Sequence, residues 1–568
     1  MNRFRAVFLI LIILLLTACN AVLPVTDSPP APTAATTATP ATTNTPKPTA
    51  TPTIESTPTP QPLTISLATD MPQAFANALG AALGDAGPLP DGRIIRLVDA
   101  GQEADASIVL RTARPDDARV LAERVFVVVA PFATMQDEIT LENLQKRWGG
   151  ADKPLFVTAD AASLLKTDMG AEPAQIVARD ALMAQLREHP GALGILAFDA
   201  LDPTFKVIKL NGDNPVDNRF SADGYPLAVQ VVVQGPASDT IADLLAGAIE
   251  PTTNRDPDKF TTLVMTGVTA MARVTAKRME QKGYDYPARV IGPELSAADI
   301  THISNEIPFI KGCKVNASSS NLKFCSKPEY WAALAAVGTD IVGLSGNHVN
   351  DFGRKGARES LAFYEEIGIP VYGSGLNEKE ACKPLILKDH GNTFAFIAAL
   401  AYQPKAAWAT PDQPGACYYY SNRQKILDMI RELSQQVDIV AVELQFYETY
   451  KPWPTGKQVK EFRALRAAGA DIVTGVQSHV PQALEPYGRE EEGGPGIIAY
   501  GLGNFFFDQM WSQPTRDELY LRHAIYDRRL IHTEILTGVL YDYAQPRWAT
   551  PDQRSRILKR IFNAAPKR

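Results

Sequence analysis

Six short apolar segments in the C-terminal half of the chain each run directly into a cluster of polar residues. Such apolar runs are typical of buried β-strands. Segments with apolar residues at helical spacing separate several of them, so the pattern predicts alternating strands and helices from residue 261 to 542. The strand segments are 263–267, 299–306, 340–348, 438–445, 471–479 and 496–504, and the helical segments are 328–337, 357–367, 423–436 and 458–468.

Polar residues at the carboxyl ends of these strands are the candidates for chemistry. Alternating α/β folds bind ligands beyond the carboxyl ends of their strands, so we expect these side chains to meet at one end of one sheet. Each could instead only cap a strand or stabilise a turn. However, polar clusters at the ends of all six predicted strands favour a composite site. The candidates are Glu306, Asn347, His348, Gln445, Gln477, His479 and Asn504.

Residues 64–255 have a separate α/β pattern, which includes the continuous apolar run 125–132. Two stretches, 138–150 and 189–212, resemble the phosphate-type family of periplasmic solute-binding proteins. The resemblance implies an anion held by backbone N–H groups at helix ends. However, Asp70 follows the first strand, and its negative charge would repel an anion. We therefore expect a solute-binding-protein-like α/β domain that serves in docking or regulation rather than as a phosphate receptor.

The first 19 residues resemble a bacterial lipoprotein signal. A basic start and an apolar run too short for a membrane span precede small residues and Cys19. The pattern predicts lipid attachment at Cys19, and a plain anchor helix with an incidental cysteine is the alternative. Residues 20–63 are mostly Thr, Pro and Ala and predict a disordered spacer. We expect an extracytoplasmic protein anchored to the cell membrane by lipid, with residues 543–568 as a C-terminal tail.

Composition bears on the number of domains and on partners. The chain has 568 residues, more than one hydrophobic core organises, so two or more domains are expected. The 56 basic and 63 acidic residues give a formal net charge of −7 without a block of like charges. This balance argues against a nucleic-acid partner.

Four motifs in the C-terminal half resemble the CapA family of capsule-synthesis proteins, which are linked to poly-gamma-glutamate production. The motifs are SNEIP from Ser304, GNHVNDFG from Gly346, GADIVTGVQSHVPQ from Gly469 and YGLGNFFFD from Tyr500, and their order and spacing match the family. The domain of that family is related to the calcineurin-like metallophosphoesterases. The resemblance therefore implies a four-layer α/β/β/α domain over residues 261–542.

The same resemblance implies roles for the residues at the strand ends. Asn347 would supply an oxygen to a metal ion while His348 faces the phosphate, and Glu306 and His479 map onto further ligand positions. The implied metal ligands are Glu306, Asn347, Gln477 and His479, the implied catalytic residues are His348, Glu306 and Asp351, and the implied substrate-binding residues are Gln445 and Asn504.

Three departures from the family's pattern change the expected metal chemistry. Val268 stands where the family has a ligating Asp, and Gln445 and Gln477 replace two histidines. An amide carbonyl is a neutral, hard oxygen donor, so these changes disfavour zinc and weaken binding. We expect one divalent ion, Mn or Mg rather than Zn, and no dinuclear centre. Metal-free acid–base chemistry, in which burial raises the pKa of Glu306 towards neutrality, and a pseudoenzyme that only binds are the alternatives.

The position of Asp351 in the sequence agrees equally well with two roles. It lies three residues after His348, close enough to orient the imidazole as a hydrogen-bond acceptor. It could equally cap a helix that begins near Gly356.

Four of the cysteines predict two disulfides. An exported chain favours oxidised cysteines, and no C-x-x-C pair supports a metal site. Cys313, Cys325, Cys382 and Cys417 allow three connectivities, among which proximity favours Cys313 with Cys325.

The resemblance implies a function in capsule or surface-polymer synthesis of the poly-gamma-glutamate type. We expect a metal-assisted hydrolase or transferase that acts on an anionic surface polymer. The alternative is a non-catalytic protein that binds the polymer or a partner synthase at the same strand ends.

Overall fold

The computed structural model of the protein describes residues 60–112, 118–170, 172–488 and 495–567. The predicted signal 1–19, lipid attachment at Cys19 and all but the last four residues of the spacer 20–63 lie outside the described residues. None of the helices in the described ranges combines the length and the apolar character needed to cross a bilayer.

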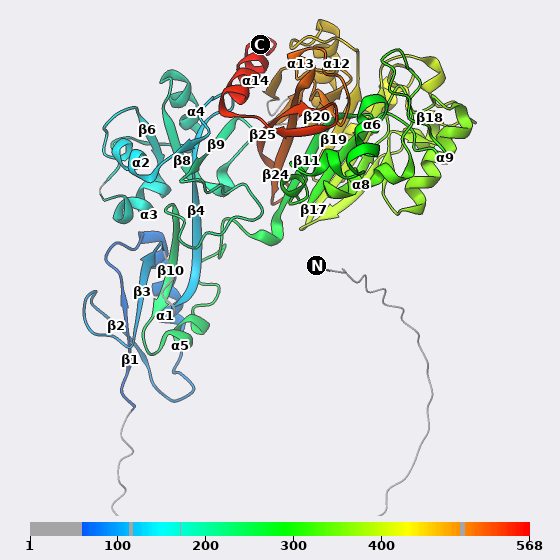
Figure 1. The fold of residues 1–568 in the computed structure, drawn as a ribbon. Helices are drawn as coiled ribbons and strands as arrows, with labels where there is room; N and C mark the ends of the chain where they lie inside the picture. The colour runs from blue at the N-terminus through cyan, green and yellow to red at the C-terminus, as the bar shows by residue number, and fades with distance from the viewer. Residues whose placement is uncertain (1–59, 113–117, 171, 489–494, 568) are drawn as a thin grey trace, which may run out of the picture. The chain divides into compact units, whose positions relative to one another are not determined.

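The first part of the described chain is an α/β structure around a ten-stranded sheet. One hydrophobic core gathers residues of β1, β3, β10, α1 and α5, and a second gathers residues of β4, β6, β8, β9, α2, α3 and α4. The long strands β4 and β10 connect these two lobes (Figure 1). The strands are β1 (Leu63–Leu67), β2 (Ile95–Val98), β3 (Ala106–Arg111), β4 (Arg119–Pro131), β5 (Glu138–Ile139), β6 (Leu155–Thr158), β7 (Ile176–Val177), β8 (Leu193–Ala197), β9 (Phe205–Leu210) and β10 (Ala228–Gln234), and the helices are α1 (Gln73–Asp85), α2 (Leu141–Trp148), α3 (Ala159–Met169), α4 (Arg179–Glu188) and α5 (Ser238–Leu244).

The second part contains an eight-stranded and a six-stranded sheet. The eight-stranded sheet consists of β11 (Phe260–Thr269), β12 (Ile300–Asn305), β13 (Thr339–Gly343), β14 (Val371–Tyr372), β23 (Asn504–Phe505), β24 (Asp517–Tyr526), β25 (Arg529–Tyr541) and β26 (Gln545–Trp548). The six-stranded sheet consists of β16 (Leu385–Asp389), β17 (Asn392–Leu400), β19 (Ile439–Gln445), β20 (Ile472–Val476), β21 (Leu484–Tyr487) and β22 (Gly496–Ala499), and β15 (Ser374–Gly375) pairs separately with β18 (Gly415–Ala416).

The helices of this part are α6 (Arg273–Lys282), α7 (Gly292–Leu295), α8 (Trp331–Ala336), α9 (Gly353–Glu366), α10 (Glu378–Ala381), α11 (Tyr419–Leu433), α12 (Gly456–Ala467), α13 (Gln513–Arg516) and α14 (Pro551–Asn563).

Three apolar cores arrange the second part in four layers. The inner core joins the two sheets, for example through Met265 of β11 and Phe396 of β17. On the outer face of the six-stranded sheet, Ile430 of α11 packs in a core with strand residues, and on the outer face of the eight-stranded sheet Leu334 of α8 does the same. The order is therefore α/β/β/α, and the predicted α/β fold class is confirmed.

Two expectations need correction. The predicted site strands do not belong to one sheet, because β11, β12 and β13 lie in the eight-stranded sheet while β19, β20 and β22 lie in the six-stranded sheet. Residues 543–568 are also more than a tail, since they contain β26 and the capped helix α14. Ile557 and Ile561 lie four residues apart on one face of α14 and are both buried in the inner core, so this segment completes the domain.

Candidate functional site

Strand ends from both sheets meet around one cavity of about 580 Å³. Glu306 follows β12, Asn347 and His348 follow β13, and Gln477 and His479 follow β20. All five line the cavity, so the structure brings these predicted residues together. A smaller cavity of about 310 Å³ lies between β9 and β25, and it contains none of the predicted site residues.

Close backbone packing and an unusual conformation hold these loops in place. A Cβ on Gly346 would lie 2.3 Å from the Cα atom of Glu306, so only glycine lets the loops after β12 and β13 approach this closely. Gln477 and His479 have φ angles of 84° and 56°, in the left-handed region that non-glycine residues seldom adopt. Such strain is typical of functional sites, where the surrounding structure over-determines it.

Three side-chain oxygens converge on the amide nitrogen of Gln445. Its Nε2 atom lies 2.9 Å from Asn347 Oδ1 and 3.2 Å from Glu306 Oε2, and it also contacts Gln477 Oε1. An amide nitrogen carries only two hydrogens, so three acceptors exceed what it can satisfy. The oxygens therefore surround this point as they would surround a cation.

Glu306 is a buried carboxyl group with an altered proton affinity. Only 1% of its surface is exposed, and burial raises its pKa to about 7, against the lowering influence of His348. The carboxyl group is therefore present in both protonated and ionised forms near neutral pH, which is the condition for accepting or donating a proton there.

His348 is oriented by Asp351. Its Nδ1 atom lies 2.8 Å from Asp351 Oδ2, while α9 begins after Phe352 without a side-chain cap. The structure thus shows the contact to the imidazole and not the helix cap. Burial by itself lowers the pKa of His348, but the hydrogen bond to Asp351 and the charge of Glu306 outweigh it, so the pKa lies above its ordinary value.

His479 is held in one tautomer. Asn504 donates its own Nδ2 hydrogens to backbone carbonyls, including that of Thr515 at 3.0 Å, which leaves its Oδ1 as the acceptor 2.9 Å from His479 Nδ1. The proton is therefore on Nδ1, and Nε2 carries a lone pair. Burial lowers the pKa of His479 to about 4, so the ring is neutral at physiological pH.

The two predicted substrate-binding residues lie behind the cavity wall. Gln445 and Asn504 are at most 1% exposed, and neither lines the cavity. Gln445 instead touches Asn347, Glu306 and Gln477, and Asn504 orients His479. Direct contact with substrate stays a prediction for these two residues, and the contacts that the structure shows support residues that line the cavity.

Several residues of the cavity wall were not among the candidates. Arg273 donates from Nε and Nη2 to Asp508 Oδ1 at 3.1 and 2.5 Å, and its guanidinium lies 5.1 and 5.2 Å from the ring centroids of Phe324 and Phe507. Glu448, Tyr450 and Trp511 also line the cavity. Its position in the sequence could have indicated Arg273, because it closely follows the first strand of the domain, just as the chosen candidates follow the other strands.

Both predicted disulfides form. Cys313 pairs with Cys325, as proximity favoured, and Cys382 pairs with Cys417.

Clusters of classical metal ligands are scarce near the cavity. Within the described ranges, the one group of three His, Cys, Asp or Glu ligand atoms lying within 4.8 Å of one another is Asp299, Asp389 and His390, none of which lines the cavity. A metal ion at the predicted site would therefore need amide oxygens among its ligands.

In the first part of the chain, the group that follows β1 already has a protein partner. Asp70 Oδ2 accepts a hydrogen bond of 2.9 Å from Thr167 Oγ1 of α3.

Comparison with known proteins shows what the second part of the chain is similar to. Residues 262–509 match the family described as "Bacterial capsule synthesis protein PGA_cap". The "Capsule biosynthesis protein CapA" of Bacillus anthracis is 28% identical over 286 residues, which cover 49% of this chain and 67% of that protein. The "PGA biosynthesis protein CapA" of Bacillus subtilis (strain 168) is 27% identical over 256 residues, which cover 45% of this chain and 65% of that protein. The chain thus spans about two thirds of the length of these relatives.

A solved structure, an ABC-type phosphate transport receptor from Vibrio cholerae, is 14% identical, with 33% of this chain and 94% of that chain covered and a TM-score of 0.24. A likeness this slight does not bear on the fold, so the similarity of residues 64–255 to solute-binding proteins stays a prediction.

Proposed function

We propose that this chain, which belongs to the CapA family of bacterial capsule synthesis proteins through residues 262–509, takes part in the synthesis or processing of a capsule polymer of the poly-gamma-glutamate type. Its proposed partners are the anionic polymer or the machinery that makes it.

The proposed location is outside the cytoplasm, at the membrane, with the lipid on Cys19. The sequence pattern of the first 19 residues supports export. The two disulfides of the second part support it independently, because disulfides persist in oxidising compartments.

The proposed activity is metal-assisted hydrolysis or transfer, and the observation that carries it is the convergence of three oxygens on one point. Glu306, Asn347 and Gln477 supply these oxygens around Gln445 Nε2. An ion at this point would require the Gln445 amide to move aside, after which the three oxygens would face the ion. One carboxylate with several neutral oxygens suits Mg²⁺ or Mn²⁺ better than Zn²⁺.

His479 offers a nitrogen ligand from the same cavity wall, since its Nε2 lone pair is free of a proton. Val268 is fully buried among apolar residues and cannot supply the second bridging carboxylate. The residues present therefore fit one ion and not two. Such an ion, when bound, would polarise a substrate oxygen and acidify a bound water.

The remaining steps fall to residues of the chain itself. In the metal-free alternative, Glu306, whose pKa burial raises to about 7, can take a proton from water or from an attacking hydroxyl group. His348 is tied at Nδ1 to Asp351, so its Nε2 atom is the one that can pass a proton to a leaving group in the cavity.

The alternative is a protein that binds the polymer without catalysis. The short contacts of Gln445 Nε2 favour this alternative, because an amide nitrogen at that point fills the space that an ion would need.

Metal analysis of residues 60–568, which form one compact unit, separates these two proposals. The fragment is offered Mn, Mg, Ca, Fe and Zn in turn. We expect close to one Mn or Mg per chain in the natural protein and loss of this metal in Asn347→Ala. Asn563→Ala, at an exposed position of α14, is the matched control and should retain the metal. Metal content no higher in the natural protein than in Asn347→Ala would favour the binding protein.

A second measurement tests turnover directly with poly-gamma-glutamate. If the protein is a hydrolase, His348→Ala should lower turnover by about two orders of magnitude while polymer affinity changes little. Unchanged turnover in this variant would remove His348 from the proposed mechanism. Absence of turnover with every metal, beside measurable polymer binding, would leave the binding protein.

A further inference from the structure

The loop between Cys313 and Cys325 forms one wall of the functional cavity. Ser319, Leu322 and Phe324 of this loop line it. From residue 313 to 325, all of which the structure describes, the loop contains no helix or strand. Sheet or helix hydrogen bonds therefore do not hold this wall in place, and the disulfide closes it.

Phe324, the neighbour of Cys325, connects this loop to His348 in two ways. Its backbone N–H donates to Asp351 Oδ2 at 2.7 Å, and its ring lies 4.4 Å from the His348 ring, centroid to centroid. Only 3% of Phe324 is exposed, so both contacts are shielded from water.

A single oxygen atom carries the connection. Asp351 Oδ2 accepts both from Phe324 N at 2.7 Å and from His348 Nδ1 at 2.8 Å. The loop thus fixes the carboxylate that fixes the imidazole. If Phe324 moved away, Asp351 would lose one of its two donors, and the His348 ring would lose the aromatic face that limits its rotation.

We propose that the disulfide-closed loop 313–325 positions His348 in the cavity, with Phe324 and Asp351 as positioning residues. The chain of contacts runs from the disulfide through Phe324 to Asp351 and then to the imidazole. The proposal rests on the function proposed above only in so far as His348 acts in catalysis. The orientation of the ring can be tested without any activity.

The second disulfide offers a matched control. Cys382 and Cys417 belong to the outer core of the six-stranded sheet with α11 and α12, and neither lines the cavity. Removing that disulfide therefore costs the chain a comparable covalent link without touching Phe324, Asp351 or His348.

The test is the tautomer of His348, read by NMR from residues 60–568 labelled with ¹⁵N-histidine at alkaline pH, where the ring is neutral. All seven histidines of the chain lie in this fragment, and His348→Gln assigns the signal. In the natural protein, we expect the proton on Nδ1, facing Asp351. In C313S/C325S we expect the two ring-nitrogen shifts to move towards each other, as the ring samples both tautomers.

Two comparisons make the outcome decisive. The signal of His479, which is held by Asn504, should stay unchanged in C313S/C325S, and the signal of His348 should stay unchanged in C382S/C417S. If C313S/C325S does not fold, Phe324→Ala in the intact loop removes the ring contact but keeps the backbone N–H, and it should move the two ring-nitrogen shifts of His348 towards each other by a smaller amount. A folded C313S/C325S or Phe324→Ala protein with an unaltered His348 signal would overturn the proposal.

Turnover gives an independent reading if the protein hydrolyses its polymer. We expect C313S/C325S to lower kcat by about tenfold or more with little change in KM, the usual effect of losing a supporting partner. Absence of turnover in the natural protein would count against the proposed hydrolase. The NMR result would still decide whether the loop positions His348.

Discussion

Two buried ionisable residues between the sheets show how burial, rather than pairing, sets the charge of a side chain. Glu443 of β19 and His302 of β12 are fully buried between the two sheets, with 3.5 Å between Glu443 Oε2 and His302 Nε2. Burial raises the pKa of Glu443 to about 7 and lowers that of His302 to about 3. The histidine is therefore neutral at physiological pH, and the contact is not an ion pair there.

This gives a prediction for the pH dependence of stability. The pKa of Glu443 rises from 4.5 to about 7 on folding, so its protonated form favours the folded state. That contribution is fully present below pH 4.5 and is lost as pH rises through 7, a change of about 3 kcal/mol. In Glu443→Gln, which cannot titrate, the free energy of unfolding should fall by about that much less between pH 4.5 and pH 8 than in the natural protein.

Urea denaturation across this range measures the difference, and Glu432→Gln, on the exposed face of α11, is the control. Parallel pH profiles for Glu443→Gln and the natural protein would show that Glu443 does not titrate in this way.

Single residues at the strand ends were predictable where the chain simply continues past a strand. Glu306, Asn347 and His348 could be chosen for that reason. Glu448 and Tyr450 could not, because they reach the cavity through a turn in which Tyr450 has a φ of 54°, and no periodic pattern signals such a turn. Asn504 was chosen but supports His479, since a sequence does not reveal which side of a polar residue faces the cavity.

At the scale of elements, the site depends on how closely two strand ends approach. A Cβ on Gly346 would meet the Cα, Cβ and backbone oxygen of Glu306 at 2.3 to 2.7 Å. The φ angle of Gly346 does not lie in the left-handed region, so the need for glycine comes from this contact and not from conformation.

Gly346→Ala should therefore destabilise the protein by about 2 to 3 kcal/mol, as overpacking typically does. It should also lower metal binding, because Asn347 and Glu306 would be pushed apart. Gly80→Ala is the matched control, since Gly80 lies inside α1 with nothing within 4 Å of a new Cβ. There alanine should stabilise by up to about 1 kcal/mol. Thermal unfolding of both variants measures the contrast, and equal stability would argue against the close approach.

The existence of the elements could be predicted better than their assignment to sheets. The strands β12, β13, β19 and β20 were predicted because buried strands are continuous apolar runs. Such runs look alike in either sheet, so the sequence did not reveal that the site lies between two sheets. The helix α14 was missed because its apolar positions become meaningful only against the inner core that they cover.

At the scale of the whole described molecule, a shared core and a network of charges join its two parts. Phe198 of the first part packs against Phe260 and Tyr526 of the second, with ring centroids 5.8 and 5.2 Å apart. Beside this core, Val207 of β9 donates its backbone N–H to His532 Nε2 of β25 at 3.0 Å. These contacts predict that the two parts unfold together.

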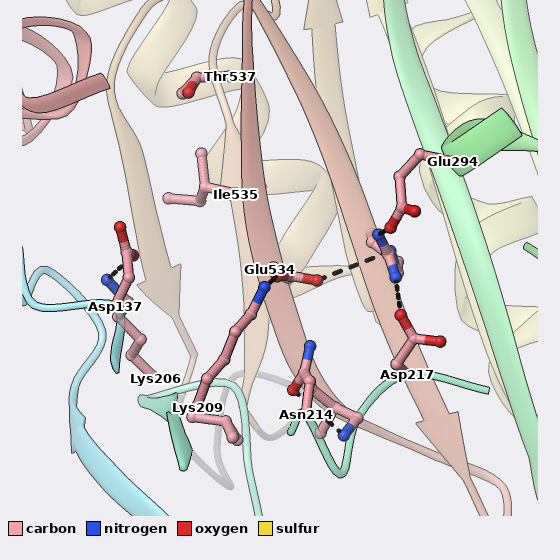
Figure 2. A network of polar contacts seen from close by, with 12 residues as sticks. Asp137, Lys206, Lys209, Asn214, Asp217, Glu294, Glu534, Ile535 and Thr537 are labelled. Atoms are coloured by element: carbon pink, nitrogen blue, oxygen red, sulfur yellow. Dashed lines mark hydrogen bonds and ion pairs between the residues drawn. The ribbon is translucent and has the colours of Figure 1, made fainter. Parts of the chain in front are cut away.

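Arg522 of β24 is the centre of the charge network. It is 5% exposed and pairs with Asp217 of the first part at 2.6 Å, with Glu294 of α7, and with Glu534 of β25 at 3.6 Å. Figure 2 shows these three carboxylates converging from separate segments, with Lys209 reaching Glu534 from the first part. Only 15% of the Glu534 side chain is exposed, so its charge relies on these cations.

Arg522→Met removes the positive charge while keeping an unbranched apolar side chain, and it should lower the free energy of unfolding by about 1 to 3 kcal/mol, because three carboxylates lose the cation they share while Arg219 and Lys209 remain as their other partners. Arg431→Met is the control: Arg431 pairs with Asp428 on exposed α11, where loss of an ion pair should cost less than about 1 kcal/mol. Hydrogen exchange of peptides from β8 and from β19 separates the two parts of the molecule. If the two parts form one cooperative unit, Arg522→Met should lower the free energy of the opening that permits exchange by the same amount in both peptides. A change confined to one peptide would mean that the charges join two independently stable domains.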